Sequence, residues 1–91
     1  MSFTRQSILF IGGLDISVDE TMLYHTFVEF PLSYIKIAKD RNTGVSLGYG
    51  FIGFKNYSKA EEAMIKLNNK IVRNKKIRIS WFDKDKKKNK K

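Results

Sequence analysis

The stretch LGYGFIGF, residues 47–54, places two large aromatic side chains two positions apart. In a β-strand, successive side chains point to opposite faces of the sheet. Tyr49 and Phe51 would therefore share one face, and Ile52 and Phe54 would share the other. Which of these two faces is buried depends on the segments that pack around this strand.

Patterns along the chain predict the element order β-α-β-β-α-β. Short apolar or alternating segments predict strands at residues 7–12, 33–39, 47–54 and 75–80. Capping-box spacings predict that one helix begins at Ser17 with Glu20 and the other at Ser58 with Glu61. Pro31 is expected to end the first helix.

This order predicts an α+β fold, the ferredoxin-like sandwich. Right-handed crossovers in such a fold place both helices on one face of a four-stranded antiparallel sheet. The aliphatic side chains of the other strands must then lie beneath the helices, which assigns Ile52 and Phe54 to the core. Tyr49 and Phe51 would project from the open face, where alternation also places Phe10. We call Phe10, Tyr49 and Phe51 the aromatic triad.

An apolar patch on an open sheet generally marks a binding site. Lys36, Lys39 and Arg78 are expected around the margin of the aromatic triad. Flat rings bordered by cations suit single-stranded nucleic acid, because bases stack on aromatic planes while Lys and Arg contact phosphates.

The composition limits the protein to one small domain. The chain has 91 residues and no cysteine, so we expect one thin core and neither a disulfide framework nor a thiolate zinc site. No stretch approaches the roughly 18 apolar residues of a membrane span, and the N-terminus lacks a secretory pattern. We expect a monomer in the cytoplasm or the nucleus that needs neither a cofactor nor a metal.

Much of the net charge of +9 lies at the C-terminus, where residues 84–91 read KDKKKNKK. We expect the folded domain to span residues 7–82, with a flexible lead before it at 1–6 and a disordered basic tail after it at 83–91. The tail is either a solubilising end or a grip on polyanions. Lys84, at its start, is a candidate phosphate contact.

Two of these stretches resemble the signature sequences of the RNA recognition motif, or RRM. LFIGGL, residues 9–14, is similar to the family's first-strand hexamer, with Phe10 at its stacking position. LGYGFIGF is similar to the third-strand octamer K/R-G-F/Y-G/A-F-V-x-F/Y, with Tyr49 and Phe51 at the displayed aromatic positions. The resemblance covers residues 7–82 and implies that bases stack on the aromatic triad. Leu47 departs from it, because the octamer usually begins with Lys or Arg.

Within the family, the chain is most similar to the first RRM of cytoplasmic poly(A)-binding proteins, through MLY (22–24), SLGYGF (46–51) and IRISW (77–81). This likeness implies a preference for adenine-rich RNA, such as the poly(A) tail of mRNA. GGLD and DRNTG look equally like RRMs of splicing factors, which leaves a different RNA preference open.

The poly(A) resemblance adds two candidate contacts at strand ends that border the open face. Asp40 could accept a hydrogen bond from the exocyclic amine of adenine. Trp81 reaches the open face only if its strand ends or twists before it, because strict alternation puts it beneath the sheet with Ile77 and Ile79. Both placements of Trp81 remain open from the sequence.

Two other function classes compete with RNA binding. An RRM can bind a protein or another RRM of the same protein, through its helices or its sheet, but the intact aromatic triad argues against a protein-only module. A small enzyme on this sandwich is disfavoured, because the lone His25 has no Cys or carboxylate cluster to complete a nucleophile and base. The expected function is non-catalytic binding of single-stranded RNA.

Overall fold

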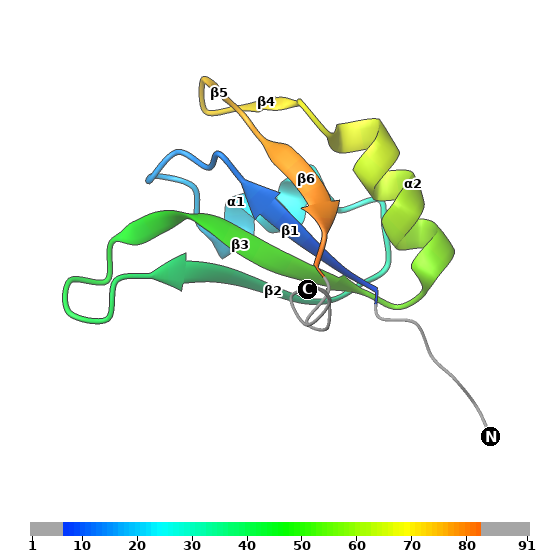
Figure 1. Ribbon diagram of the computed structural model, residues 1–91, viewed down its shortest axis with the longest axis horizontal. Helices are drawn as coiled ribbons and strands as arrows, with labels where there is room; N and C mark the ends of the chain where they lie inside the picture. The colour runs from blue at the N-terminus through cyan, green and yellow to red at the C-terminus, as the bar shows by residue number, and fades with distance from the viewer. Residues whose placement is uncertain (1–6, 83–91) are drawn as a thin grey trace, which may run out of the picture.

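A computed structural model describes residues 7–82. Its elements follow the predicted order, with a short hairpin added near the end (Figure 1). They are β1 (Ile8–Gly12), α1 (Glu20–Thr26), β2 (Leu32–Lys39), β3 (Ser46–Phe54), α2 (Tyr57–Leu67), β4 (Ile71–Val72), β5 (Lys75–Lys76) and β6 (Arg78–Trp81).

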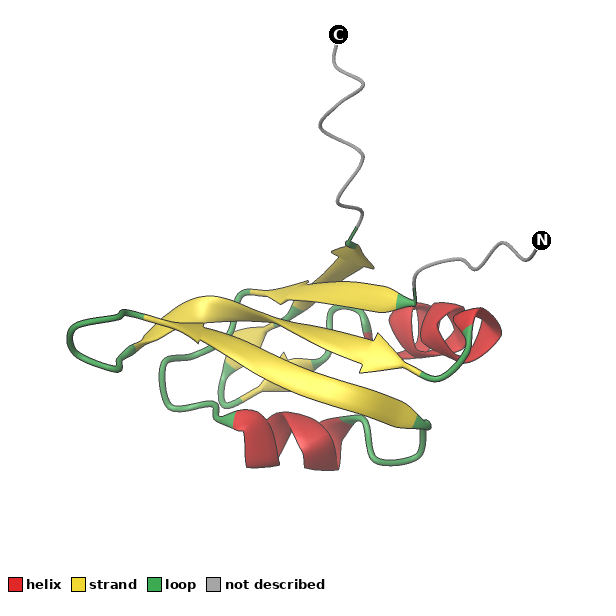
Figure 2. Ribbon diagram, turned by 90° about the horizontal axis from the view of Figure 1, so that it is seen from below, coloured by secondary structure: helices red, strands yellow, loops and turns green. Residues whose placement is uncertain are grey.

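The main sheet has four strands in the order β2-β3-β1-β6, and every neighbouring pair is antiparallel. The two central strands, β1 and β3, are the ones that carry the aromatic triad. Figure 2 shows both helices on the same side of this twisted sheet. The predicted ferredoxin-like α+β sandwich is therefore confirmed, and no helix within residues 7–82 covers the other face of the sheet.

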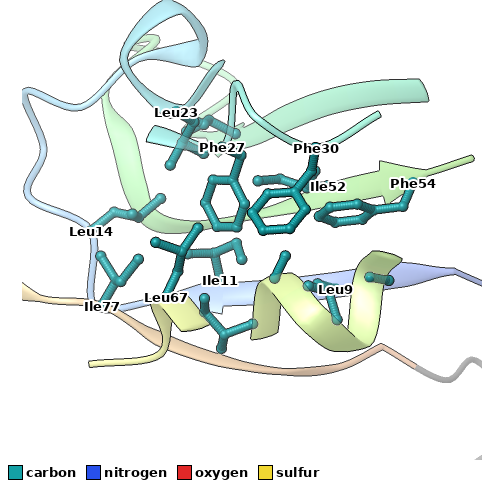
Figure 3. Packing of buried hydrophobic residues seen from close by; sticks show 14 of the residues in the cluster. Leu9, Ile11, Leu14, Leu23, Phe27, Phe30, Ile52, Phe54, Leu67 and Ile77 are labelled. Atoms are coloured by element: carbon teal, nitrogen blue, oxygen red, sulfur yellow. The ribbon is translucent and has the colours of Figure 1, made fainter. Parts of the chain in front are cut away.

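The core lies between the sheet and the helices (Figure 3). Ile52 and Phe54 are buried in it, as the alternation predicts, and Ile52 has no solvent exposure at all. The core also contains Leu9, Ile11, Ile37, Ile77, Ile79, Leu23, Phe27, Ala60, Ala63 and Leu67. Burial of this set fixes the strand register, since a slip by one residue would turn every side chain to the other face.

The first helix begins two residues later than its capping-box pattern predicts. The carboxylate of Asp19 accepts a hydrogen bond from the Met22 amide at 2.9 Å and is the N-cap. The amide and the hydroxyl of Ser17 both donate to Asp15 instead. The helix also ends at Thr26, well before Pro31, so Phe30 packs in the core from the segment between them.

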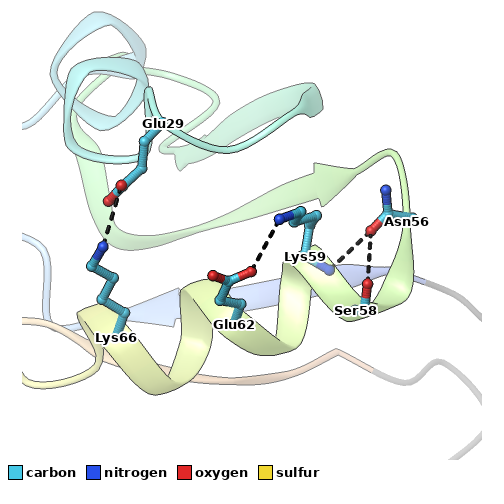
Figure 4. Close-up of polar contacts among 6 residues, drawn as sticks. All are labelled: Glu29, Asn56, Ser58, Lys59, Glu62 and Lys66. Carbon is cyan, nitrogen blue, oxygen red and sulfur yellow. Dashed lines mark hydrogen bonds and ion pairs between the residues drawn. The ribbon is translucent and has the colours of Figure 1, made fainter.

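The second helix begins two residues earlier than predicted. The Asn56 side-chain oxygen accepts from the Lys59 amide at 2.9 Å and also from the Ser58 hydroxyl at 3.3 Å (Figure 4). Ser58 therefore lies inside the helix instead of capping it. Near the other end of α2, Lys66 forms an ion pair at 3.3 Å with Glu29, which follows α1. This pair connects the two helical segments across their exposed surface.

The fourth predicted strand is divided at Ile77. Lys75 and Lys76 pair with Ile71 and Val72 in a small hairpin, and only the residues after Ile77 join the main sheet. The hairpin turn lies at Arg73 and Asn74, whose φ angles are 53° and 69°. Positive φ at both central residues is typical of a type I′ turn. The sequence gives a weak signal for this turn, because it contains Asn but no glycine.

Close contact between the two strands β2 and β3 depends on Gly50. A Cβ atom at this position would lie 2.4 Å from the carbonyl oxygen of Lys36 and 3.2 Å from the Cα of Ile37. The first contact is shorter than real Cβ atoms show and the second is tighter than most, so a side chain here would force the neighbouring strand away. The register opposite the aromatic triad rests on this contact.

Candidate nucleic-acid interface

Strand pairing brings the aromatic triad together on the open face. Phe10 of β1 lies directly opposite Phe51 of β3, and Gly12 lies opposite Tyr49. Directly paired residues of antiparallel strands project to the same face. Ile52, the residue after Phe51, points to the opposite face and is buried in the core. All three rings therefore lie on the side of the sheet that faces away from the helices, as the alternation predicts.

The three rings form one contiguous cluster. The ring centroids of Phe10 and Tyr49 are 5.6 Å apart, with their planes tilted by 32°. The Phe51 ring lies 5.6 Å from Phe10 and 6.0 Å from Tyr49, and it stands nearly edge-on to both. These distances are those of favourable aromatic pairs. The triad is thus pre-arranged, and each ring remains half-buried.

Gly12 leaves room for the Phe10 ring on this face. A Cβ atom at Gly12 would lie 3.1 Å from Cε2 of Phe10. A side chain at this position would force the Phe10 ring to shift slightly, because this contact is tighter than most real Cβ contacts. Gly12, the last residue of β1, therefore supports the position of the Phe10 ring in the triad.

Two further aromatic side chains that the sequence reasoning did not assign lie on the open face. Phe82 follows β6, and its ring centroid is 4.8 Å from that of Phe51. Tyr34 of β2 lies opposite Gly53 and is 45% exposed. The alternation of Arg78 and Ser80 could have predicted the outward position of Phe82, had the predicted strand been continued by two residues.

Tyr34 reaches the open face through an irregularity in β2. The register shifts between Leu32 and Tyr34, so Ser33 and Tyr34 both lie over one residue of the partner strand, as in a β-bulge. A Cβ atom on Gly53 would lie 2.5 Å from Cε2 of Tyr34 and 2.8 Å from Oγ of Ser33. Gly53 therefore provides the space in which the Tyr34 ring lies against the sheet.

Two of the predicted cations lie on the open face. Lys36 is directly opposite Phe51, and Arg78 is directly opposite Gly12. Both side chains are exposed. They stand on the two edge strands of the sheet, one on each side of the triad. A strand of nucleic acid lying across the rings would pass between two positive charges.

Two other predicted contacts do not face the open side. The Lys39 ammonium forms an ion pair with the Glu20 carboxylate of α1 at 3.4 Å, which draws it toward the helical side. Trp81 is paired with Leu9, a core residue, and its indole stacks on Tyr57 of α2 at 4.6 Å with the planes 2° apart. The strand does not twist before Trp81, so strict alternation holds and the outward placement is wrong. Lys84 lies outside the described residues.

Asp40 organises the loop between β2 and β3. Its Oδ2 accepts from the amides of Asn42 and Thr43, at 3.1 and 2.9 Å, and from the Thr43 hydroxyl at 3.1 Å. These bonds, first of all the one from the Thr43 amide, hold the pKa of the Asp40 carboxyl below its ordinary value. Asp40 is therefore ionised near neutral pH, with one carboxylate oxygen committed to the loop.

The hairpin β4–β5 adds cations that the sequence reasoning did not select. Arg73, Lys75 and Lys76 are all exposed. Hydrogen bonds from the Ser17 hydroxyl and amide hold the pKa of the Asp15 carboxyl below its ordinary value, and the charges of Lys75 and Arg73 add a smaller effect in the same direction. These positive charges therefore extend the basic surface beyond Arg78 toward the loop that follows β1.

Residues 7–82 contain neither a candidate metal cluster nor a helix that could span a membrane. This part of the chain has no group of three His, Cys, Asp or Glu side chains that could hold a metal ion. Neither of the two helices described there is long and apolar enough to cross a membrane. His25 is exposed on α1 and makes an edge contact with the ring of Tyr24.

The chain resembles known proteins along most of its length. The sequence profile of the RNA recognition motif family matches residues 9–78. Polyadenylate-binding protein 4 of Arabidopsis thaliana is 37% identical over 78 residues, which cover 85% of this chain and 12% of that protein. Splicing factor 3B subunit 4 of Homo sapiens is 40% identical over 82 residues, which cover 87% of this chain and 19% of that protein. The chain spans only a small part of the length of these curated relatives.

Solved structures share the same fold. The second RRM domain of yeast poly(U)-binding protein (Pub1) superposes with a TM-score of 0.80 and 33% identity, over 85% of this chain and 94% of that one. The Sxl-lethal protein/RNA complex superposes with a TM-score of 0.82 and 29% identity, over 87% of this chain and 48% of that one. The profile match includes both strands that carry the aromatic triad. The chain belongs to the RNA recognition motif family.

Proposed function

We propose that this protein binds single-stranded RNA, without catalysis, on the open face of its sheet. The observation that carries the proposal is the aromatic triad, a contiguous ring cluster on the face without helices, between Lys36 and Arg78. Bases that stack on exposed aromatic rings gain about 1–3 kcal/mol each. Relatives in RNA-binding families, named as polyadenylate-binding protein and splicing factor, support this function and a nuclear or cytoplasmic location.

Affinity for short labelled RNA, measured by fluorescence anisotropy, tests this proposal. Tyr49→Ala should weaken binding by about 1–3 kcal/mol, because one stacking surface is lost. The matched control is Tyr24→Ala, which removes a tyrosine that is 50% exposed on α1, behind the sheet. Equal affinities of the two variants would contradict binding at the open face.

Within RNA, adenine-rich sequence is the preference we propose. Its support is the likeness to polyadenylate-binding proteins, but a splicing factor subunit is similarly close, and a distinct preference is the alternative. Stacking tolerates every base, so base identity must come from hydrogen bonds to base edges. Asp40 is the candidate, since its carboxylate accepts hydrogen bonds, as the adenine amine requires.

The adenine preference is tested with oligo(A), oligo(U), oligo(C) and oligo(G). Asp40→Asn is the useful variant, because its carbonyl oxygen can keep the loop hydrogen bonds of Oδ2 while an NH2 group replaces the other acceptor. We expect the ratio of oligo(A) to oligo(U) affinity to fall about fivefold, the value of one net hydrogen bond. If the unmutated protein binds oligo(U) as tightly as oligo(A), the adenine preference is wrong and RNA binding stands.

A further inference from the structure

The ring of Phe82 makes an edge contact with Phe51, on which one base of the proposed RNA would stack. Its ring centroid is 4.8 Å from that of Phe51, with the planes at 64°. No other ring pair on the open face is described at so short a distance within residues 7–82. Phe51 thus has three aromatic neighbours, and the nearest of them comes from outside the two strands that carry the triad.

The space between the two rings is too small for a base. A base placed between two aromatic rings needs about 3.5 Å on each side, and hence a separation of about 7 Å. The measured 4.8 Å excludes such an insertion. A base can therefore stack on the side of Phe51 that Phe82 contacts only after Phe82 has moved. Among the described residues, Phe51 is the member of the aromatic triad with a ring contact to Phe82.

The backbone of Phe82 is fixed while its side chain is not enclosed. The Phe82 amide donates to the carbonyl of Ile8 at 3.0 Å, which continues the pairing of β6 with β1. The preceding Trp81 is held on the helical side by its stacking on Tyr57. These two contacts direct Phe82 to the open face, where the residue remains half-buried. The ring can consequently leave Phe51 by rotation about its own side-chain bonds.

We propose that Phe82 is a displaceable cover on Phe51, which single-stranded RNA must move before a base stacks there. This inference rests on the proposed function of the open face. An aromatic pair contributes less than a base stacked on an aromatic ring, so RNA displaces the cover but binds more weakly than it would to an uncovered ring. The apparent affinity at Phe51 is the intrinsic affinity multiplied by the fraction of molecules in which Phe51 is uncovered.

Removal of the cover should tighten RNA binding. With the full 91-residue chain, we expect Phe82→Ala to lower the Kd for a short labelled oligonucleotide by about 2- to 12-fold, the range of one aromatic pair. A double-mutant cycle with Phe51→Ala separates a cover from a direct contact. If Phe82 acts by covering Phe51, Phe82→Ala should change the Kd less than twofold in the Phe51→Ala background.

A second measurement uses the wild-type protein and therefore does not depend on whether a variant folds. Ring protons of Phe51 and Phe82 should give nuclear Overhauser contacts in the free protein, and these should disappear when the oligonucleotide is added. Weaker or unchanged binding by a folded Phe82→Ala, or ring contacts that persist in the complex, would overturn the cover while leaving RNA binding intact. If the wild-type protein binds no oligonucleotide at all, the proposed function fails, and the cover fails with it.

Discussion

Phe51 and Ile52 are adjacent in the chain but face opposite sides of the sheet, so truncation of each should affect a different property. Ile52 is completely buried, and its partners across the strands are Leu9 and Ile35. Phe51 is half-buried on the open face. We expect Ile52→Ala to lower stability, and Phe51→Ala to lower RNA affinity.

The magnitudes follow from what each substitution removes. Ile52→Ala deletes three buried carbon atoms, at about 0.8 kcal/mol each from transfer alone. The cavity that remains adds to this, which gives a loss of about 3–5 kcal/mol in the free energy of unfolding. Phe51→Ala leaves no cavity beneath the helices, and it should reduce RNA affinity by about 1–3 kcal/mol through the lost stacking surface.

Urea unfolding followed by circular dichroism measures the first effect, and fluorescence anisotropy with a labelled oligonucleotide measures the second. A loss of about 3–5 kcal/mol is a large fraction of the 5–15 kcal/mol typical of small domains. Ile52→Val, with an expected cost of about 0.5–1.5 kcal/mol, keeps the comparison measurable if the alanine variant does not fold. Negligible destabilisation by both Ile52 variants would refute the assignment of the two faces.

Three further substitutions test other parts of the structure. Gly50→Ala should destabilise the fold by about 1–3 kcal/mol in urea unfolding, because its Cβ would clash with the Lys36 carbonyl; unchanged stability would show that the strands can separate. Lys36→Gln should lower the salt slope of RNA binding by about 0.7 if it contacts one phosphate, while Lys66→Gln on the helical side should leave the slope unchanged. The folded pKa of Asp40 is lowered, so its charge stabilises the fold above the ordinary carboxyl pKa of 3.8, and this stabilisation is lost as the pH falls through the lowered value. Asp40→Asn should therefore lose less stability between pH 6 and pH 2 than the unmutated protein, in urea titrations at about these pH values.

The face assignment was predictable because it follows from the two-residue period of a strand. Once the aliphatic sets of the other strands are placed beneath the helices, Tyr49 and Phe51 can only point outward, and strand pairing adds Phe10. The helix starts were less predictable, since Ser, Asp and Asn cap helices almost equally well. Asp15 accepts a hydrogen bond from Ser17, and the N-cap of the first helix is Asp19.

The residues that sequence reasoning misplaced or did not assign lie where the strand period is interrupted or where a strand ends. A register shift in β2 brings Tyr34 over Gly53, and a turn without glycine separates β4 from β5. Lys39 follows a second register shift and is drawn to Glu20 by an ion pair. Such features depend on contacts between distant segments, which a single strand's pattern does not contain.

The end of β6 illustrates how one such boundary changes the site. If the strand ended before Trp81, the indole would be free to join the open face and Phe82 would have no defined direction. Stacking of Trp81 on Tyr57 instead extends the alternation by one residue and turns Phe82 toward Phe51. The helical side thereby determines which aromatic residue lies over the triad. Loss of the Trp81 indole should release Phe82 from Phe51, so Trp81→Leu is expected to tighten RNA binding in the same direction as Phe82→Ala if the domain stays folded. Weaker binding by a folded Trp81→Leu would instead mean that the helical-side contact positions the triad itself.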